Sequence, residues 1–474
     1  MAQIESTELT APTHRSAEDR AAAGKRARAA SPRRGHVEFA PTAGRPDPVD
    51  VLEGQATTRV SELIPIRYGR MLVSAFTFYR GGAALMAGDL AAVPQTDLQV
   101  QLCGDAHLSN FGVFAAPDRR LVFSVNDFDE TLPGPFEWDV KRLVASFAVA
   151  GRDRGFDAKK RKVINRAVVR AYREAMREFA GMRNLDIWFA RLDLDDIARR
   201  MRSFADAKQI RRFDRNVAKA HSKDSLRAFG KLTTMVDGEP RIVADHPVLT
   251  PVEDLMTPKD RERVHAMAEE IIGAYRDTLP DDRRRLMEEY RYVHAARKVV
   301  GVGSVGTRAW IMLLLGRDGD DPLFLQFKEA QPSVLEPALG PSAYENHGRR
   351  VVEGQRLMQS ASDVMLGWVR TLGLDGETRD FYVRQLWDAK GSALIEFMDP
   401  RALEFYGRIC AWTLARAHAR SGDPIAIASY LGSSDTFDRA LAEFAELYAD
   451  QNESDYAALQ GAVASGRVEA QAAI

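Results

Sequence analysis

CGDAHLSNFGVF, residues 103–114, begins at the end of the apolar run LQVQLC and is the most informative segment of the chain. The run predicts a short strand, and the polar residues after it predict a loop. Asp105 and Asn110 stand here in the spacing D-x-x-x-x-N, which is typical of phosphotransfer catalytic loops. Such a loop uses an aspartate to take the proton of the accepting hydroxyl and an amide oxygen to bind a metal. We therefore predict that Asp105 is the catalytic base, although both residues could instead only stabilise a turn.

A second strand carries two further acids. LVFSVNDFDETLPGPFEWDVKRL, residues 121–143, opens with β-branched and aromatic residues that predict a strand ending near Asp127 and Asp129. Side chains two apart on a strand point the same way, and carboxylate oxygens suit Mg²⁺. Either both acids bind the metal or one binds it and the other caps a turn. The predicted metal ligands are Asn110, Asp127 and Asp129.

These segments together resemble the aminoglycoside-phosphotransferase branch of the protein-kinase-like superfamily. In that branch a G-D-x-H-x-x-N loop precedes a D-F-[DE] strand end and a G-P-x-x-x-D-[LV] helix start, which Gly134, Pro135, Asp139 and Val140 match. We expect Asp139 to cap its helix or to brace the catalytic loop. The resemblance covers about residues 103–145. It implies an α+β protein with a two-lobed kinase-like fold that binds ATP and Mg²⁺.

A glycine-rich segment lies much later in the chain. VVGVGSVGTRAWIMLLLGRDGDDPLFLQFKEA, residues 299–330, contains the pattern G-x-G-x-x-G, which dinucleotide-binding folds also use. A dinucleotide-binding oxidoreductase is one alternative for this chain, and its fold requires a helix after Gly306. Here two apolar runs joined by a turn follow, and the second ends at Lys328, which predicts the phosphate-covering hairpin of kinases with its phosphate-binding lysine. The predicted phosphate cover consists of Gly301, Gly303, Ser304 and Gly306.

A phosphate-binding lysine of this kind needs a carboxylate to hold it. The helix expected at about residues 348–360 offers Glu353, which we predict as the partner of Lys328, with Glu336 as the alternative. Arg80, upstream of the catalytic loop, is expected to contact an acidic neighbour rather than a phosphate.

The order of the segments is anomalous, because in ordinary kinases the Gly-rich loop and lysine precede the catalytic loop. Circular permutation accounts for this, since only the spatial assembly matters to the chemistry. The segment DFYVRQLWDAKGS then forms the hinge. The expected divisions are a disordered basic arm rich in Ala, Arg, Pro and Ser (1–50), the catalytic-loop and metal-binding part of the C-terminal lobe (51–158), a mainly helical inserted block (159–298), an N-terminal-lobe-like sheet with the Gly-rich loop and lysine (299–395), and C-terminal helices (396–474).

Composition excludes several classes. The 474 residues carry a formal net charge of -1, which gives no reason to expect a specific nucleic acid as partner. The two cysteines, Cys103 and Cys410, are far apart, so neither a disulfide scaffold nor a zinc site is indicated. No apolar run is long enough to span a bilayer, and the first residues lack the apolar region of a signal peptide. We expect a cytoplasmic protein without a membrane partner.

Beyond the arm, the chain also resembles the bacterial family known as domain of unknown function 2252, through the stretches GDAHLSNFG, NDFDETLPGPFEWDVKRL, GVGSVGTR and FKEA. This resemblance implies a kinase-like fold and names no substrate. We expect an ATP-dependent phosphotransferase that acts on an unknown acceptor, a small molecule by analogy. Two alternatives stay open: a nucleotidyl transferase that moves AMP, and a catalytically inactive nucleotide-binding or scaffold protein.

Overall fold

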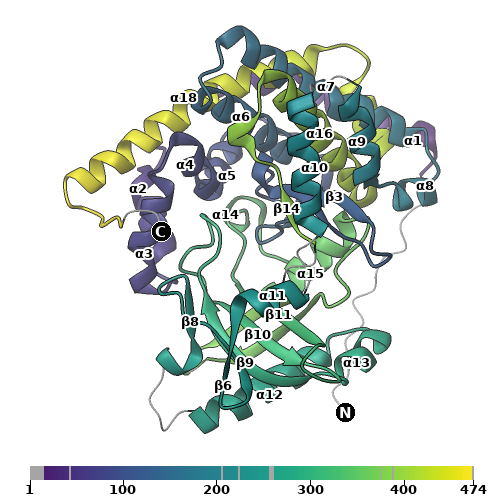
Figure 1. Cartoon of the computed structure of the whole chain (residues 1–474). Helices are drawn as coiled ribbons and strands as arrows, with labels where there is room; N and C mark the ends of the chain where they lie inside the picture. The colour runs from purple at the N-terminus through teal and green to yellow at the C-terminus, as the bar shows by residue number, and fades with distance from the viewer. Residues whose placement is uncertain are drawn as a thin grey trace, which may run out of the picture.

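The chain folds into a mixed α+β structure with a mainly helical part, in the upper half of Figure 1, and a part built on a six-stranded sheet below it. None of the helices that the structure describes combines the length and apolar character needed to cross a bilayer. The computed structural model describes residues 15–41, 44–203, 207–221, 225–255, 261–373, 375–386 and 389–471.

The larger sheet is antiparallel, with strand order β12-β13-β11-β10-β9-β8. Its two faces follow from alternation along β11: Phe324 packs on one face with Leu313, whereas Leu325 and Phe327 pack on the other with Val369. The strands are β8 (Leu249–Pro251), β9 (Arg291–Lys298), β10 (Ala309–Leu315), β11 (Pro322–Ala330), β12 (Gly367–Leu372) and β13 (Thr378–Gln385).

The predicted hairpin after the Gly-rich loop is confirmed, because β10 and β11 pair in register from Ala309↔Lys328 to Leu315↔Pro322. The helix that a dinucleotide fold requires after Gly306 is absent, since β10 follows instead. The predicted lower boundary of this sheet at residue 299 is wrong: β8 and β9 belong to it and lie inside the block expected to be mainly helical. The remaining elements of that part are α11 (Ser225–Leu232), β6 (Thr233–Val236), β7 (Glu239–Ile242), α12 (Arg261–Arg276), α13 (Asp281–Met287), α14 (Glu336–Leu339) and α15 (His347–Met358).

A smaller sheet, in the order β14-β2-β3-β5, lies in the helical part. After β13 the chain leaves the large sheet and returns beside β2, where Gly391 pairs with Val113. This connection lies within the predicted hinge segment, of which residues 387–388 fall outside the described residues. The bounds are β1 (Gln99–Leu102), β2 (Phe111–Ala115), β3 (Leu121–Val125), β4 (Leu132–Pro135), β5 (Leu192–Asp193) and β14 (Gly391–Ser392), with β1 and β4 forming a separate pair.

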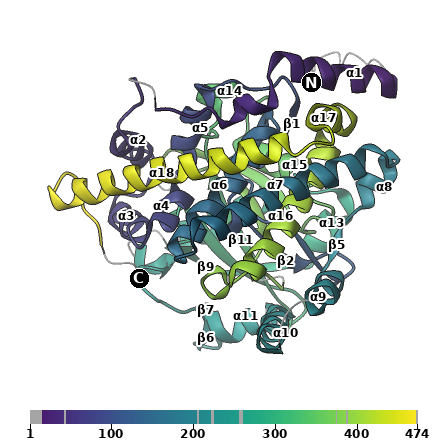
Figure 2. The same cartoon turned by 90° about the horizontal axis from the view of Figure 1, so that it is seen from above.

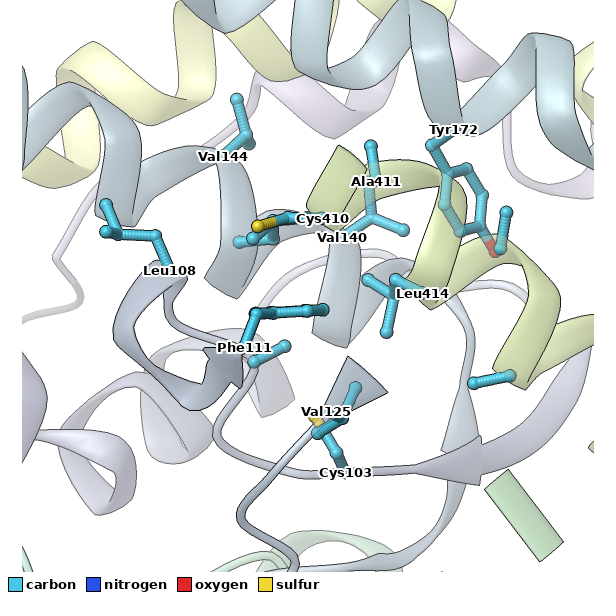
Figure 3. Packing of buried hydrophobic residues seen from close by; sticks show 14 of the residues in the cluster. Cys103, Leu108, Phe111, Val125, Val140, Val144, Tyr172, Cys410, Ala411 and Leu414 are labelled. Carbon is cyan, nitrogen blue, oxygen red and sulfur yellow. The ribbon is translucent and has the colours of Figure 1, made fainter. Parts of the chain in front are cut away.

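The helical part surrounds α6, whose side chains are buried almost from end to end. Figure 2 shows α7, α16 and α18 running over it. In Figure 3, Val140 of α6 meets Leu414 of α16, next to Phe111 and Val125 of the small sheet. The helices are α2 (Pro48–Ala56), α3 (Ile64–Met71), α4 (Ala75–Gly81), α5 (Ala83–Ala91), α6 (Glu137–Asp153), α7 (Ala158–Ala180), α8 (Asn184–Phe189), α9 (Leu194–Arg202), α10 (Ala207–His221), α16 (Pro400–Ser421) and α18 (Thr436–Ala464).

The prediction of a disordered arm over residues 1–50 is wrong for the described residues 15–41 and 44–50. Helix α1 (Ala17–Ala30) packs along α17 (Pro424–Leu431), and Arg28 Nε donates to the carbonyl of Tyr430 (2.8 Å). Gly24 lies so close to α17 that a Cβ there would come within 2.0 Å of the Ala426 carbonyl oxygen. Small residues thus dock this helix by close approach, which a search for large apolar side chains does not detect. Residues 1–14 lie outside the described residues.

Candidate functional site

The two parts of the molecule meet around two adjoining cavities. The first, of about 430 Å³, has the catalytic-loop residues on one side and the Gly-rich loop between β9 and β10 on the other. The second, of about 310 Å³, lies against the large sheet and is lined by Lys328. Both cavities share Asp127, Gly301 and Ser304. Most of the predicted site residues line one of them: Asp105, Asn110, Asp127, Asp129, Gly301, Gly303, Ser304 and Lys328.

The β2–β3 hairpin places two of the three predicted metal ligands, Asn110 and Asp127, side by side. Phe111 pairs with Val125, and one step further Asn126 N donates to the carbonyl of Asn110 (2.8 Å). Asn110 and Asp127 therefore leave the same end of the hairpin and both line the larger cavity. Asn110 Nδ2 donates to the carbonyl of Asp105 (2.8 Å), which leaves the amide oxygen available to a ligand.

The Asp105 carboxylate is held by Arg142. Arg142 Nε donates to Asp105 Oδ1 (2.8 Å), and its guanidinium lies over the ring of Tyr79, 3.9 Å from the centroid. Burial raises the pKa of Asp105, while Arg142 and Arg80 oppose that rise. His107 orders the loop, because its Nδ1 accepts a hydrogen bond from Ser109 N (3.2 Å).

Asp139 braces the catalytic loop, which confirms one of the two predicted roles. Its carboxylate accepts hydrogen bonds from Cys103 N (2.8 Å) and Gly104 N (3.1 Å), directly before Asp105. His418 Nε2 lies 3.2 Å from the same carboxylate. Helix α6 therefore positions Asp105 through two side chains. Asp139 holds the backbone before Asp105, and Arg142, one turn later, holds its carboxylate.

Lys328 pairs with Asp129, and not with either predicted glutamate. Its ammonium contacts Asp129 Oδ2, while Tyr382 Oη donates to Asp129 Oδ1 (2.8 Å). Burial alone would raise the pKa of Asp129, but Lys328, Tyr382 and Arg384 together lower it. Conversely, Asp129 raises the pKa of Lys328 against its burial. The acid that holds the lysine therefore comes from the segment that directly follows β3.

The prediction that Glu353 or Glu336 holds the lysine is wrong. Helix α15 packs Gly354 against Thr131, and the preceding Glu353 lies near Arg356 on its own helix (3.4 Å). Glu336 Oε1 accepts from Ser333 N (3.0 Å) in a local turn.

The donor set fits a magnesium ion at Asp127 and Asn110. Burial and the neighbouring charge of Asp129 raise the pKa of Asp127, and a bound cation would relieve both effects. Within the described ranges, no group of three or more His, Cys, Asp and Glu side chains is arranged to hold a metal by itself. Mg²⁺ commonly takes one or two carboxylates and completes its shell with phosphates and waters. Both oxygens of Asp129 already accept hydrogen bonds, from Lys328 and Tyr382, but Oδ1 keeps a second lone pair, so the role of Asp129 as a metal ligand stays a prediction.

The Gly-rich loop is held by the helices that precede the catalytic loop. Arg70 Nη1 donates to the carbonyl of Gly301 (2.7 Å), and Val60 N donates to that of Gly306 (2.8 Å). Gly301 and Gly306 have φ of +68° and +90°, a conformation that side chains oppose. Sequence reasoning missed Arg70 and Val60, because their contacts join segments more than 200 positions apart.

Arg80 faces the larger cavity and does not form the ion pair expected of it. The charges of Asp105 and Asp127 favour its protonated form, yet burial lowers its pKa. Its Nε is buried without a hydrogen-bond partner, and among the described residues no carboxylate pairs with it. A guanidinium is therefore available beside the catalytic loop.

The family described as "Uncharacterized protein conserved in bacteria (DUF2252)" matches residues 59–462. The chain belongs to this family. The DUF2252 match includes the residues on both sides of the cavities, from α3 to Lys328. It begins after α1 and α2. No curated protein and no solved structure matched the chain.

Proposed function

We propose that this protein is an ATP-dependent phosphotransferase with a circularly permuted kinase-like fold. The observation that carries the proposal is the meeting of Lys328 with Asp129, next to Asp127 and around cavities that also contain Asp105. A lysine from a Gly-loop hairpin and acids from a D-x-x-x-x-N loop and a D-F-D strand end are the parts that kinase chemistry needs together. Their reversed order along the chain changes none of these contacts.

In this proposal the nucleotide occupies the cavity against the large sheet. Lys328 offers its ammonium to the phosphates, and Ser304 of the Gly-rich loop covers them. The connection between β13 and β14 forms the hinge, since Gln385 and Leu386 line the same cavity. Asp127, Gly301 and Ser304, which line both cavities, mark where the terminal phosphate would pass from one cavity to the other.

In the transfer step the acceptor hydroxyl oxygen bonds to the terminal phosphorus, and the bond from that phosphorus to the ADP oxygen breaks. The hydroxyl proton passes to Asp105, whose pKa burial raises above its ordinary value. Arg142 aims the carboxylate, and Arg80 faces the charge of the transferred group. Mg²⁺ bound by Asp127 and Asn110 would supply neutralisation of phosphate charge.

Transfer from ATP labelled at the γ or the α phosphate, with a small-molecule extract of bacteria as acceptor, tests this proposal. We expect γ label on a product and none in Asp105→Asn, which should still bind ATP. Retained α label would support nucleotidyl transfer. Nucleotide binding without any label transfer would support the inactive nucleotide-binding protein.

A further inference from the structure

We propose that the acceptor carries an anionic group, a carboxylate or a phosphate monoester, which Arg59 and Arg67 bind at the end of the larger cavity. This inference rests on the proposed function, since it assigns the acceptor of that same site. Both arginines line the cavity that contains Asp105. The observation behind it is a fully buried guanidinium, Arg67, and a partly buried one, Arg59, neither of which forms an ion pair with a carboxylate among the described residues.

Arg67 is 1% exposed and lies on α3. Its guanidinium donates only to neutral oxygens, the carbonyl of Leu52 (3.3 Å) and Gln55 Oε1 (2.6 Å). Burial, together with the charge of Arg59, lowers the pKa of Arg67 to about 9. Among the described residues no acid pairs with it, which is unusual for so deeply buried a charge.

Arg59 adds a second guanidinium of the same kind. Its Nη1 donates to the carbonyl of Val305 in the Gly-rich loop, and its Nε is buried without a partner. Burial lowers the pKa of Arg59 as well. Two like charges held together out of water are costly, and an anion placed between them would relieve both the repulsion and the missing hydrogen bonds.

The acids that also line this cavity form no ion pair with either arginine among the described residues: burial, which lowers the pKa of Arg59, outweighs the charges of Glu130 and Glu329, which raise it. Glu329 lies near Arg308 (3.4 Å) and Arg379 (3.7 Å), and therefore has its own cations. Glu130 accepts from Val334 N (2.8 Å), and burial raises its pKa to about 7. On the side of the cavity formed by α2, α3 and the segment between them, the charged residues are therefore the cations Arg59 and Arg67.

The cavity gives an acceptor two fixed points. Its hydroxyl would lie at Asp105 and its anionic group at Arg59 and Arg67, along a wall completed by Val51 and Gln55. A volume of about 430 Å³ suits a small metabolite. A polycationic acceptor, the kind that an aminoglycoside-like enzyme would use, meets like charge on this wall and is disfavoured.

Thermal unfolding of the full chain tests the inference, with Mg²⁺ and a saturating non-hydrolysable ATP analogue present so that the triphosphate position is filled. Inorganic phosphate and glycerol 3-phosphate are the anionic probes, and glycerol is the neutral one. At a hundredfold excess over Kd we expect each anion to raise the Tm by about 3 °C and glycerol to have no effect. Sodium chloride at matched ionic strength controls for salt.

Arg67→Met should raise the anion concentration needed for the Tm shift at least about tenfold and leave the Tm shift caused by the ATP analogue unchanged. Arg59→Gln should do the same and serves if Arg67→Met does not fold. The exposed Arg183, which pairs with Asp186 on α8, provides a matched control, since Arg183→Met should keep both responses. An equal response in wild type, Arg67→Met and Arg59→Gln, or none in wild type, would overturn the anion site. If the ATP analogue does not raise the Tm of the wild type but the anions do, the result would instead contradict the proposed function.

Discussion

Replacing Lys328 by Met is expected to destabilise the protein in a pH-dependent way. The substitution keeps the length of the side chain but leaves Asp129 without its cation. Removing one partner of a buried ion pair costs about 3–5 kcal/mol where the remaining charge is fully desolvated. Asp129 is 23% exposed and keeps the hydroxyl donors of Tyr382 and Ser304. We therefore expect a loss of about 2–3 kcal/mol in unfolding free energy at pH 7.

The sign of the pH effect follows from Asp129. In the wild type its pKa lies below the ordinary value, so the stability it contributes is present above the unfolded pKa, about 3.9, and is lost as pH falls through the folded pKa. Without Lys328, burial raises the pKa of Asp129 above its unfolded value, so the variant loses stability as pH rises from the unfolded pKa towards the folded one. The difference between the two proteins should grow from pH 4 to pH 7.

Urea unfolding followed by tryptophan fluorescence at pH 4, 5 and 7 measures this difference. In Lys328→Met/Asp129→Asn the unpaired charge is gone, so the double variant should be more stable than the sum of the single effects by at least about 1 kcal/mol. Equal destabilisation at pH 4 and pH 7, together with additive single effects, would refute the pairing of Lys328 with Asp129.

Three further predictions concern the catalytic loop, the cavity and the N-terminal helix. Arg142→Lys should lower the rate of phosphate transfer by about 10–100-fold at unchanged nucleotide affinity, because Asp105 loses its aligned partner; an unaltered rate in a labelled-ATP assay would contradict this. Glu130 has a pKa raised to about 7, so it weakens folding as pH rises from its unfolded value through 7; Glu130→Gln should flatten that decline by about 1–2 kcal/mol in urea titrations, and an unchanged slope would oppose it. Gly24→Val should cost about 1–3 kcal/mol and expose α1 to protease, whereas Gly461→Ala, on an open helix face, should cost nothing measurable.

Local patterns predicted the elements that carry the site. The β-branched and aromatic run in LVFSVND and the hairpin from Ala309 to Ala330 are properties of short segments, and the structure has strands in both places. The D-x-x-x-x-N spacing placed Asp105 and Asn110 in a loop that does line a cavity. Such features could be predicted because period-2 burial and turn residues act over a few positions.

The partner of Lys328 could not be predicted in the same way. It depends on how α15 is rotated, and Gly354 rather than Glu353 faces the strand end at Thr131. Asp129 lies 199 positions from Lys328, and nothing in either segment identifies the other. Arg67 was missed for a related reason: a single arginine is usually exposed, and its contacts with Leu52 and Gln55 join different elements.

The helix α1 was missed because of its composition. Ala and Arg dominate it, and a segment with so few large apolar residues resembles a solvated arm. Its docking depends on the absence of side-chain volume at Gly24 and Ala27, both buried against the rest of the protein. Composition alone cannot separate a solvated arm from a helix docked through small residues, since the two differ only in the surface that the segment meets.

The most direct test of the nucleotide site is calorimetric titration of ATP into the protein with and without Mg²⁺. Binding to the wild type should require the metal, and Asp127→Asn and Lys328→Met should each weaken it at least about tenfold, because they remove a metal ligand and a phosphate-binding ammonium. Glu353→Gln, which alters a glutamate outside both cavities, should bind ATP like the wild type. ATP affinity that is the same in wild type, Asp127→Asn and Lys328→Met would contradict the account.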